Sequence, residues 1–232
     1  GSKSIKDKNV YTVGDRPLVR YPIQAALDAR LIQGVYVSTD GENIARVAEG
    51  MGCRIIRRPP DLAGDHVNHG DVIKHATECV DGIEEDLESV VLLLGNTVMI
   101  DGELIDHCLR ILADREDLDS VMTVWEAADD HPLRSLEIAD GLVRSYGDPN
   151  RDVSTERQSY PKAYYYDQGV WAFRKECVQR RDGPNPWWWM GKRCFPVVRP
   201  WVTGRDIHTE LDVAVAEWWL SRRADRKKHI SC

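Results

Sequence analysis

The sequence has no long apolar run, no paired cysteine motif and no strong excess of either charge. No stretch approaches the roughly 18 consecutive apolar residues that cross a bilayer. The six cysteines are scattered without a C-x-x-C pair, which argues against a zinc site or a disulfide framework. A net charge of −7 argues against a general nucleic-acid-binding protein. We therefore expect a cytoplasmic protein that binds neither nucleic acid nor a membrane.

What is present is the composition of a folded domain. The 232 residues are 42% hydrophobic and 30% charged, which lies outside the range of disordered chains. A chain of this length forms one large domain or two small ones and buries a sizeable core.

Short apolar runs alternate with amphipathic stretches over the first two-thirds of the chain, as in parallel strands joined by helices. The expected strands are residues 35–38, 54–56, 90–94 and 120–124, and the expected helices are 42–52, 71–80 and 104–112. The unbroken apolar run 90–94 predicts a strand buried on both faces at the centre of the sheet. The sequence therefore predicts a doubly wound α/β fold with ligands bound in the loops after Ser38, Ile56 and Leu94.

From Trp125 onward the pattern changes to short, polar-rich strands near residues 136–138 and 142–143, followed by a long loop to Tyr166. This segment is interpreted as an excursion from the sheet. The chain then returns to apolar strands at 169–173 and 194–198 and ends on a helix at about 210–224.

Two segments carry basic side chains suited to an anion. Residues 1–9 combine small residues with three lysines, a composition that suits a polyphosphate, although a solvated basic terminus or an expression remnant explains it equally. Arg57 and Arg58 follow a strand in a loop on the expected ligand side, where a plain surface turn is the alternative.

Near the end of the chain, Asp206 and His208 alternate along an extended stretch and so share one face, where together they are able to hold a metal. Thr209 and Asp212 have the spacing of a capping box, so Asp212 is alternatively only a helix cap. Three aromatic clusters (164–166, 187–189 and 218–219) either stack on a base or sugar or, as is more common, pack in a core or interface.

Several segments, taken in chain order, resemble the motifs of the acylneuraminate cytidylyltransferases, also called CMP-sialic acid synthetases, with the 3-deoxy-manno-octulosonate (KDO) cytidylyltransferases as more distant relatives. The matching residues are Gly1-Ser2-Lys3 with Lys8-Asn9, Arg16-Pro17-Leu18 to Ala26, Val37-Ser38-Thr39-Asp40 with Ile44-Ala45, Arg58-Pro59 to Asp65, His131-Pro132, Arg157-Gln158 with Pro161-Lys162-Ala163-Tyr164, and Asp206 to Asp212. The likeness covers nearly the whole chain.

The resemblance implies a Rossmann-like fold of the nucleotide-diphospho-sugar transferase type and transfer of CMP from CTP to the anomeric hydroxyl of a 2-keto sugar acid, with release of pyrophosphate. It implies Mg²⁺ or Mn²⁺ as cofactor and a homodimer formed through residues 126–166. The implied nucleotide-binding residues are Gly1, Ser2, Lys3, Lys8, Asn9, Arg58, His69 and Asn96. The implied substrate-binding residues are Arg157, Gln158, Tyr165, Asp167 and Gln168. Lys8, Asp206 and His208 are implied as catalytic, the last two also as metal ligands.

The sequence departs from the family pattern in places that affect the choice of acceptor. Where the family has Gln and Arg after the central strand, this sequence has Leu94 and Ile100. Residues 167–171 stand in place of the family's N-G-A-I-Y motif. The second Asp of the family's D-x-D pair is His208, a poor Mg²⁺ ligand that is alternatively a base toward the acceptor hydroxyl.

These departures leave alternatives open: a nucleotidyltransferase for a non-sialic acidic acceptor, or a catalytically silent homologue that binds nucleotide or a partner. The family also carries a buried apolar strand just ahead of its Gly-Ser-Lys motif. No residues here supply that strand, and we expect the natural protein to contain it before Gly1.

Overall fold

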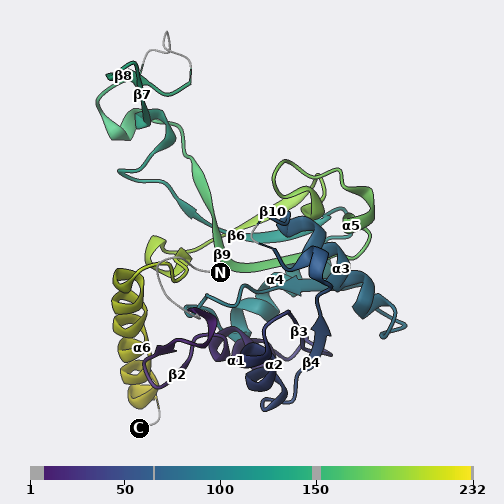
Figure 1. Cartoon of the computed structure of the whole chain (residues 1–232). Helices are drawn as coiled ribbons and strands as arrows, with labels where there is room; N and C mark the ends of the chain where they lie inside the picture. Colours follow the sequence, from purple (N-terminus) through teal and green to yellow (C-terminus); the bar gives the residue numbers. More distant parts are fainter. Residues whose placement is uncertain (1–7, 65, 148–152, 231–232) are drawn as a thin grey trace.

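The computed structural model describes residues 8–64, 66–147 and 153–230. Its main sheet has four strands in the order β10-β6-β9-β5 (Figure 1). These are β5 (Ser89–Leu92), β6 (Ser120–Glu126), β9 (Tyr164–Arg174) and β10 (Cys194–Val198). β10 is parallel to β6, whereas β9 runs antiparallel to both of its neighbours. The sheet is therefore mixed rather than wholly parallel.

Helices cover both faces of this sheet because side chains along each strand alternate in direction. Val170 and Ala172 of β9 pack with α1 (Arg20–Asp28) and α4 (Gly102–Asp114). Trp171 and Phe173 pack on the opposite face with α3 (His69–Asp81) and α5 (Cys177–Arg180). The doubly wound α/β architecture expected from the sequence is confirmed.

A second, two-stranded sheet carries the early part of the chain. β3 (Tyr36–Thr39) and β4 (Arg54–Arg57) are parallel and are joined by α2 (Glu42–Glu49), as the alternating pattern predicts. Ala45 and Ala48 of α2 are fully buried, and with Val19 and Ile23 they belong to the core under this sheet.

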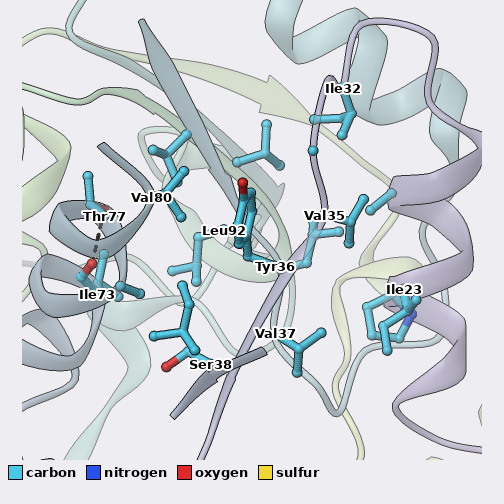
Figure 2. A pocket seen from close by; sticks show the side chains of 18 of the residues that line it. Ile23, Ile32, Val35, Tyr36, Val37, Ser38, Ile73, Thr77, Val80 and Leu92 are labelled. Carbon is cyan, nitrogen blue, oxygen red and sulfur yellow. Dashed lines mark hydrogen bonds between the residues drawn. The ribbon is translucent and has the colours of Figure 1, made fainter. Parts of the chain in front are cut away.

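The strand predicted at 90–94 is present as β5, but its predicted central position in the sheet is wrong. β5 pairs only with β9 among the described residues, and β3 pairs only with β4. A cavity of about 770 Å³ lies between them, lined mainly by apolar side chains such as Ile23, Val37 and Leu92 (Figure 2). The edge of β5 opposite β9 therefore borders this cavity, while Val91 and Leu93 pack in the core on one face of the sheet and Val90 and Leu92 on the other.

Residues 127–147 and 153–163 leave the main sheet as an arm that projects away from the body of the molecule (Figure 1). Its short antiparallel strands, β7 (Leu136–Ala139) and β8 (Leu142–Ser145), lie where the sequence predicts them. Both strands expose large apolar side chains, for example Ile138 at 81% and Val143 at 66%. The arm thus carries apolar surface with no cover among the described residues.

The last helix, α6 (Glu210–Ile230), begins where the sequence predicts and packs on a short hairpin of β1 (Thr12–Val13) and β2 (Arg16–Pro17). No described helix is long and apolar enough to cross a membrane. The remaining elements are short helical turns: η1 (Lys8–Val10), η2 (Pro60–Leu62), η3 (Pro132–Arg134), η4 (Arg157–Ser159), η5 (Trp188–Met190) and η6 (Trp201–Gly204).

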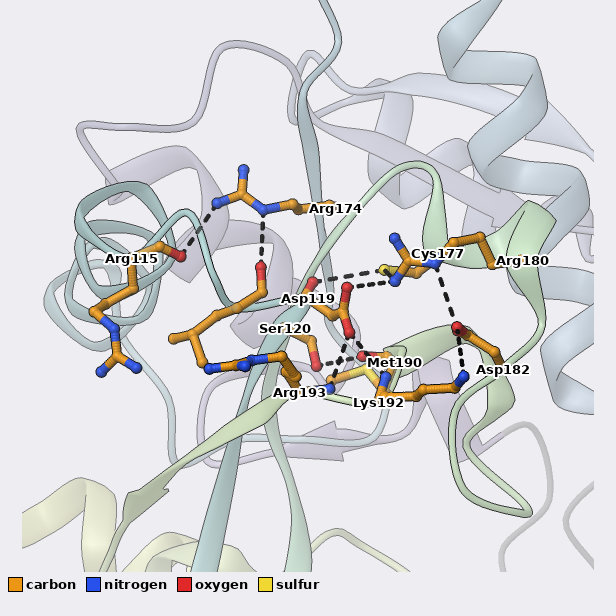
Figure 3. Close-up of polar contacts among 11 residues, drawn as sticks. Arg115, Asp119, Ser120, Arg174, Cys177, Arg180, Asp182, Met190, Lys192 and Arg193 are labelled. Carbon is orange, nitrogen blue, oxygen red and sulfur yellow. Dashed lines mark hydrogen bonds and ion pairs between the residues drawn. The ribbon is translucent and has the colours of Figure 1, made fainter.

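Asp119, just before β6, organises the loop that follows α5 (Figure 3). One carboxylate oxygen accepts from the backbone N–H groups of Lys192 and Arg193, both at 2.9 Å, and the other pairs with Arg180. Burial of Asp119 opposes its ionisation, but these hydrogen bonds outweigh that effect and lower its pKa. The network fixes both ends of residues 180–193, which carry the tryptophans 187–189.

Candidate functional site

The first cavity opens at the carboxyl ends of β3, β4 and β5, where an α/β sheet binds its ligands. Its lining includes five of the residues implied for nucleotide binding: Lys8, Asn9, Arg58, His69 and Asn96. They come from four separate parts of the chain, since Lys8 and Asn9 are adjacent, and the fold brings them to one opening. Gly1, Ser2 and Lys3, implied for the same role, lie outside the described residues.

Arg58 is held at this opening by the end of β3. Its guanidinium donates to the backbone oxygen of Ser38 at 2.7 Å and lies 3.8 Å from Asp40. Burial lowers the pKa of Arg58, with Asp40 acting in the opposite direction, yet an arginine remains cationic at neutral pH. A half-buried cation in a cavity is suited to a phosphate group.

Lys8 and Asn9 lie together in η1, at the edge of the same cavity. The backbone oxygen of Asn9 accepts from Val19 at 2.8 Å, and its side chain lies against Gly95, where an added Cβ would come 3.5 Å from the Asn9 amide. Burial lowers the pKa of Lys8, while the charges of Asp206 and Asp212 oppose this shift. Lys8 thus connects the cavity electrostatically to the C-terminal acidic segment.

Asp206 and His208 do lie together, as the sequence predicts. One oxygen of Asp206 lies 2.7 Å from His208 Nε2 and accepts from the Asn96 amide at 2.6 Å. The backbone N–H of Ile207 donates to the backbone oxygen of Asn96 at 3.0 Å. These contacts join the loop after β5 to the segment before α6.

Asp212 belongs to the helix end rather than to the cavity. Its carboxylate accepts from Arg205 and from the backbone N–H groups of His208 and Thr209, and only 4% of its side chain is exposed. Burial alone would raise its pKa, but the hydrogen bonds from Arg205 and Thr209 prevail and lower it to about 2. The capping reading of Asp212 is confirmed.

A second cavity, of about 450 Å³, adjoins the first and shares His69, Leu94 and Asn96 with it. Asp206 and His208 lie on its border, and Tyr166, Gln168, Trp171, Trp187 and Trp189 form much of its wall. A group bound here is next to a nucleotide bound in the first cavity. The arrangement fits a two-substrate reaction, with each substrate in its own cavity.

His69 is at the boundary of the two cavities. It is the first residue of α3, whose N-terminus is capped by Asn68 through a 2.8 Å hydrogen bond from Gly70. Its ring packs edge-on against Trp189, with 6.4 Å between centroids. The surrounding protein lowers its pKa by desolvation, and the charge of Arg58 adds to this effect, so the neutral imidazole is favoured.

Of the substrate-binding residues implied by the resemblance, Gln168 alone lines the second cavity. Tyr165 lies away from it, stacked on Trp125 with 4.7 Å between centroids. Gln158 is exposed in η4, and the side chain of Arg157 is not described. Side chains along a strand alternate in direction, so Tyr166 and Gln168 share one face of β9. This alternation is the sequence signal that could have assigned Tyr166 to the cavity.

Asp167 does not contact the cavity, which corrects its implied role in substrate binding. Its side chain is fully buried and lies 3.0 Å from Arg199, which is itself only 8% exposed. The carboxylate also accepts from the backbone N–H of Gly169 at 2.8 Å and from the Thr123 hydroxyl. Asp167 therefore positions β9 and the loops around the site.

The members of the aromatic clusters divide between the core and the second cavity, and stacking on a base or sugar stays a prediction. Trp188 and Trp189 are buried in the core, and Trp218 is half-exposed on α6. Trp187 and Tyr166, with 4.5 Å between ring centroids, line the second cavity, and Trp189 reaches it from the core. The clusters could be found from sequence, but their assignment to core or cavity could not.

Solved structures show the same fold. The chain aligns with CMP:2-keto-3-deoxy-manno-octonic acid synthetase complexed with CTP, with a TM-score of 0.68, 15% identity, and coverage of 96% of this chain and 95% of that one. A 4-diphosphocytidyl-2C-methyl-D-erythritol synthase from Anaerococcus prevotii aligns with a TM-score of 0.61 and 15% identity over 90% and 88% of the two chains. These two likenesses define the fold class of the chain.

The sequence model of one family, described as cytidylyltransferase, matches residues 1–180. The chain belongs to this family. An N-acylneuraminate cytidylyltransferase of Escherichia coli is 33% identical over 124 residues, which are 53% of this chain and 29% of that protein. The CMP-N,N'-diacetyllegionaminic acid synthase of Campylobacter jejuni is 24% identical over 222 residues, 95% of this chain and 91% of that protein. The chain thus spans less than a third of the first relative and most of the second.

Proposed function

We propose that the protein transfers CMP from CTP to the anomeric hydroxyl of a sialic-acid-like 2-keto sugar acid and releases pyrophosphate. The observation that carries this proposal is the pair of adjoining cavities, one bordered by Lys8 and Arg58 and the other by Asp206 and His208. Membership of the cytidylyltransferase family supports CTP as the nucleotide.

In the proposed reaction the acceptor oxygen attacks the α-phosphorus of CTP while the bond to the pyrophosphate oxygen breaks. Lys8 and Arg58 neutralise the triphosphate and hold it in line, because phosphoryl and nucleotidyl transfer depend chiefly on positioning and charge. His208, held against Asp206 at the border of the acceptor cavity, accepts the proton of the attacking hydroxyl. Asn96 holds the loop after β5 against the segment before α6 through its hydrogen bonds with residues 206 and 207.

The residues present fit a divalent cation that is held mainly by the nucleotide. Among the described residues no group of three or more His, Cys, Asp or Glu side chains is arranged to hold a metal. Mg²⁺ is commonly bound by one or two carboxylates together with substrate phosphates, and Asp206 supplies one carboxylate. We propose Asp206 as that ligand, with His208 beside it as the base, because an imidazole is a poor ligand for Mg²⁺. The cation would neutralise charge on the triphosphate.

The test is a pyrophosphate-release assay with CTP, Mg²⁺ or Mn²⁺ and a panel of ulosonic acids. We expect pyrophosphate release that depends on both CTP and one of these acceptors. No release above background with any acceptor and either cation would reject the proposed reaction. Assays with UTP in place of CTP provide the nucleotide control.

We also propose that the protein is a homodimer formed through the arm. The apolar side chains of β7 and β8 are uncovered on one chain, and burying such surface stabilises an association. A cytoplasmic location remains a prediction from the sequence.

A further proposal concerns the apolar end of the first cavity. β3 and β5 each border it with the edge that faces away from their partner strand, β4 or β9, and this edge pairs with no strand among the described residues. Buried backbone groups are nearly always paired in folded proteins. We propose that this end of the cavity accepts an extended apolar segment, which would lie between β3 and β5 as a strand. A chain lengthened by such a segment should protect the amides of β3 and β5 from hydrogen exchange, and unchanged protection would contradict the proposal.

A further inference from the structure

A histidine and a cysteine lie together on α3, outside both cavities. They are His75 and Cys79, four residues apart and both partly exposed. Residues at this spacing lie one above the other on the same face of a helix. Ile73 and Thr77 of the same helix line the first cavity, whereas His75 and Cys79 line neither cavity. The pair therefore has no part in the site described above.

The distance between the two side chains matches the geometry of a bound metal ion. Cys79 Sγ lies 3.7 Å from His75 Nε2. A tetrahedral zinc ion, at about 2.3 Å from sulfur and about 2.0–2.1 Å from nitrogen, holds these two ligand atoms about 3.6 Å apart. A metal ion could thus bind both atoms without a change in the helix backbone.

The imidazole of His75 is not engaged in another network. Among the described residues its Nδ1 is buried without a hydrogen-bond partner, and its Nε2 makes its contact with Cys79. A proton on Nδ1 leaves the lone pair of Nε2 directed toward the sulfur, which is the arrangement that a metal-binding histidine needs.

The charge around the pair favours a cation. The last turn of α3 and the loop after it, residues 78–88, contain six acidic residues and no lysine or arginine. Lys74, Arg54 and Lys175 each pair with one of these carboxylates, so the segment retains a net negative charge. The carbonyl groups at the end of a helix add a partial negative charge at the same place.

We propose that His75 and Cys79 bind a thiophilic transition-metal ion such as Zn²⁺, with water in its remaining positions. Thiolate and imidazole favour Zn²⁺ over Mg²⁺, which prefers oxygen ligands. The thiol releases its proton to solvent as the bond between sulfur and metal forms. A site with two protein ligands is compatible with the absence of any larger metal-binding group among the described residues. A search for C-x-x-C does not detect it, because it combines one cysteine with one histidine.

The experiment uses the full chain, prepared without a polyhistidine tag, reduced and freed of metal. Titration with Co²⁺ reports a sulfur ligand by a thiolate-to-cobalt charge-transfer absorption. We expect this absorption to saturate at one Co²⁺ per chain and to disappear when Zn²⁺ displaces the cobalt, whereas excess Mg²⁺ leaves it in place. No cysteine lines the second cavity among the described residues, so cobalt bound there gives no such absorption. The titration needs neither CTP nor an acceptor, so its outcome is independent of the proposed function.

Two variants assign the absorption to the pair. Cys79→Ser should abolish it. His75→Gln should weaken cobalt binding by at least about 10-fold, the loss typical even of a group that only supports a metal ligand. The matched controls are Cys194→Ser, at an exposed cysteine, and His107→Gln, at an exposed histidine of α4 that has no cysteine four residues later. Both controls should keep the absorption and the affinity of the wild-type protein.

A measurement on the unaltered protein guards against a folding defect in either variant. Zn²⁺ should protect Cys79, but not Cys194, from alkylation by iodoacetamide, as read from peptide mass spectrometry. The proposal is overturned by equal alkylation of Cys79 with and without Zn²⁺, by a wild-type protein without the absorption, or by absorption that survives Cys79→Ser. Cobalt binding that is unchanged in His75→Gln would also reject it.

Discussion

Adjacent arginines at the end of β4 have different surroundings, and this difference sets what each does. Arg57 lies on the exposed side and pairs with Glu42 of α2 at 2.7 Å. Arg58 turns into the nucleotide cavity and donates to Ser38. Only Arg58 is therefore placed to meet a phosphate.

Arg58→Gln should weaken CTP binding by about 10- to 100-fold, the loss expected for one charge-assisted hydrogen bond. Arg57→Gln should leave the dissociation constant within about 2-fold, since exposed ion pairs contribute little. Isothermal titration calorimetry with CTP measures both. Equal losses in the two variants would contradict the placement of Arg58.

The carboxylate of Asp212, at the start of α6, makes the stability of the fold depend on pH. Its pKa in the folded protein is about 2, below its ordinary value of 3.8, so its carboxylate stabilises the fold at any pH above about 4. That contribution disappears as the pH falls from about 4 towards 2. At neutral pH the shift corresponds to about 2 kcal/mol.

Asp212→Asn should therefore lower the free energy of unfolding by about 2 kcal/mol at pH 7 and by roughly half as much at pH 3. Urea denaturation at the two pH values gives both quantities. Glu210→Gln, in the same helical turn, is the control and should cost little at either pH. A cost for Asp212→Asn that is the same at pH 7 and pH 3 would show that the charge is not its source.

At the scale of the elements, a buried ion pair joins three parts of the chain behind the site. Arg199, just after β10, lies 3.0 Å from Asp167 in β9 and also donates to the backbone oxygen of Met99. A Cβ on Gly169 would collide with the Arg199 guanidinium, so glycine is required beside the pair. The pair holds β9 and β10 against the loop that follows β5.

Arg199→Met should destabilise the protein by about 3–5 kcal/mol, because it leaves the buried Asp167 without its cation. Adding Asp167→Asn should recover part of this loss, since the unpaired charge is then removed. Arg180→Met, which breaks the more exposed pair with Asp119, should cost only about 1 kcal/mol or less. Denaturant unfolding orders the four proteins, and a double variant less stable than Arg199→Met would contradict this account.

The order of the elements could be predicted from hydrophobic periodicity, and their pairing could not. Each predicted strand and helix from 35 to 124 is present, because local spacing determines which faces are apolar. The apolar run of β5 indicates burial but not what buries it, and a cavity and a strand leave the same pattern in the sequence. The partner of Asp167 is 32 residues away in the chain, and nothing local marks Arg199 for that role.

At the site, the order of the motifs predicts residues that line the first cavity. The wall of the second cavity could not be predicted in this way, because it depends on tertiary packing. Arg58, Asn9 and Asn96 converge as implied. The resemblance implies Tyr165, whereas Tyr166 lines the second cavity, because a motif match fixes a segment and not the direction of each side chain. Trp187 and Trp189 reach the cavity only because the Asp119 network holds their loop on the sheet.

At the scale of the whole molecule, we expect the arm to determine the state of association. Leu136 and Ile138 of β7 are 64% and 81% exposed on a single chain. Replacing both with serine should convert a dimer of 26.4 kDa chains into monomers. Light scattering after size exclusion measures the mass. Ile83→Ser, at an apolar residue 54% exposed outside the arm, should leave the dimer intact, and a wild-type protein that is already monomeric would reject the proposed homodimer.

The two roots of the arm are direct partners in the main sheet, since Glu126 of β6 lies opposite Tyr164 of β9. Antiparallel strands that are paired in this way can be joined by a two-residue turn. Residues 127–163 are therefore a detachable module: an Asn-Gly turn in their place closes the hairpin without altering the register of the strands that remain. We therefore expect a chain shortened in this way to keep the fold of the main sheet, so that the contribution of the arm to association can be measured separately from that of the body.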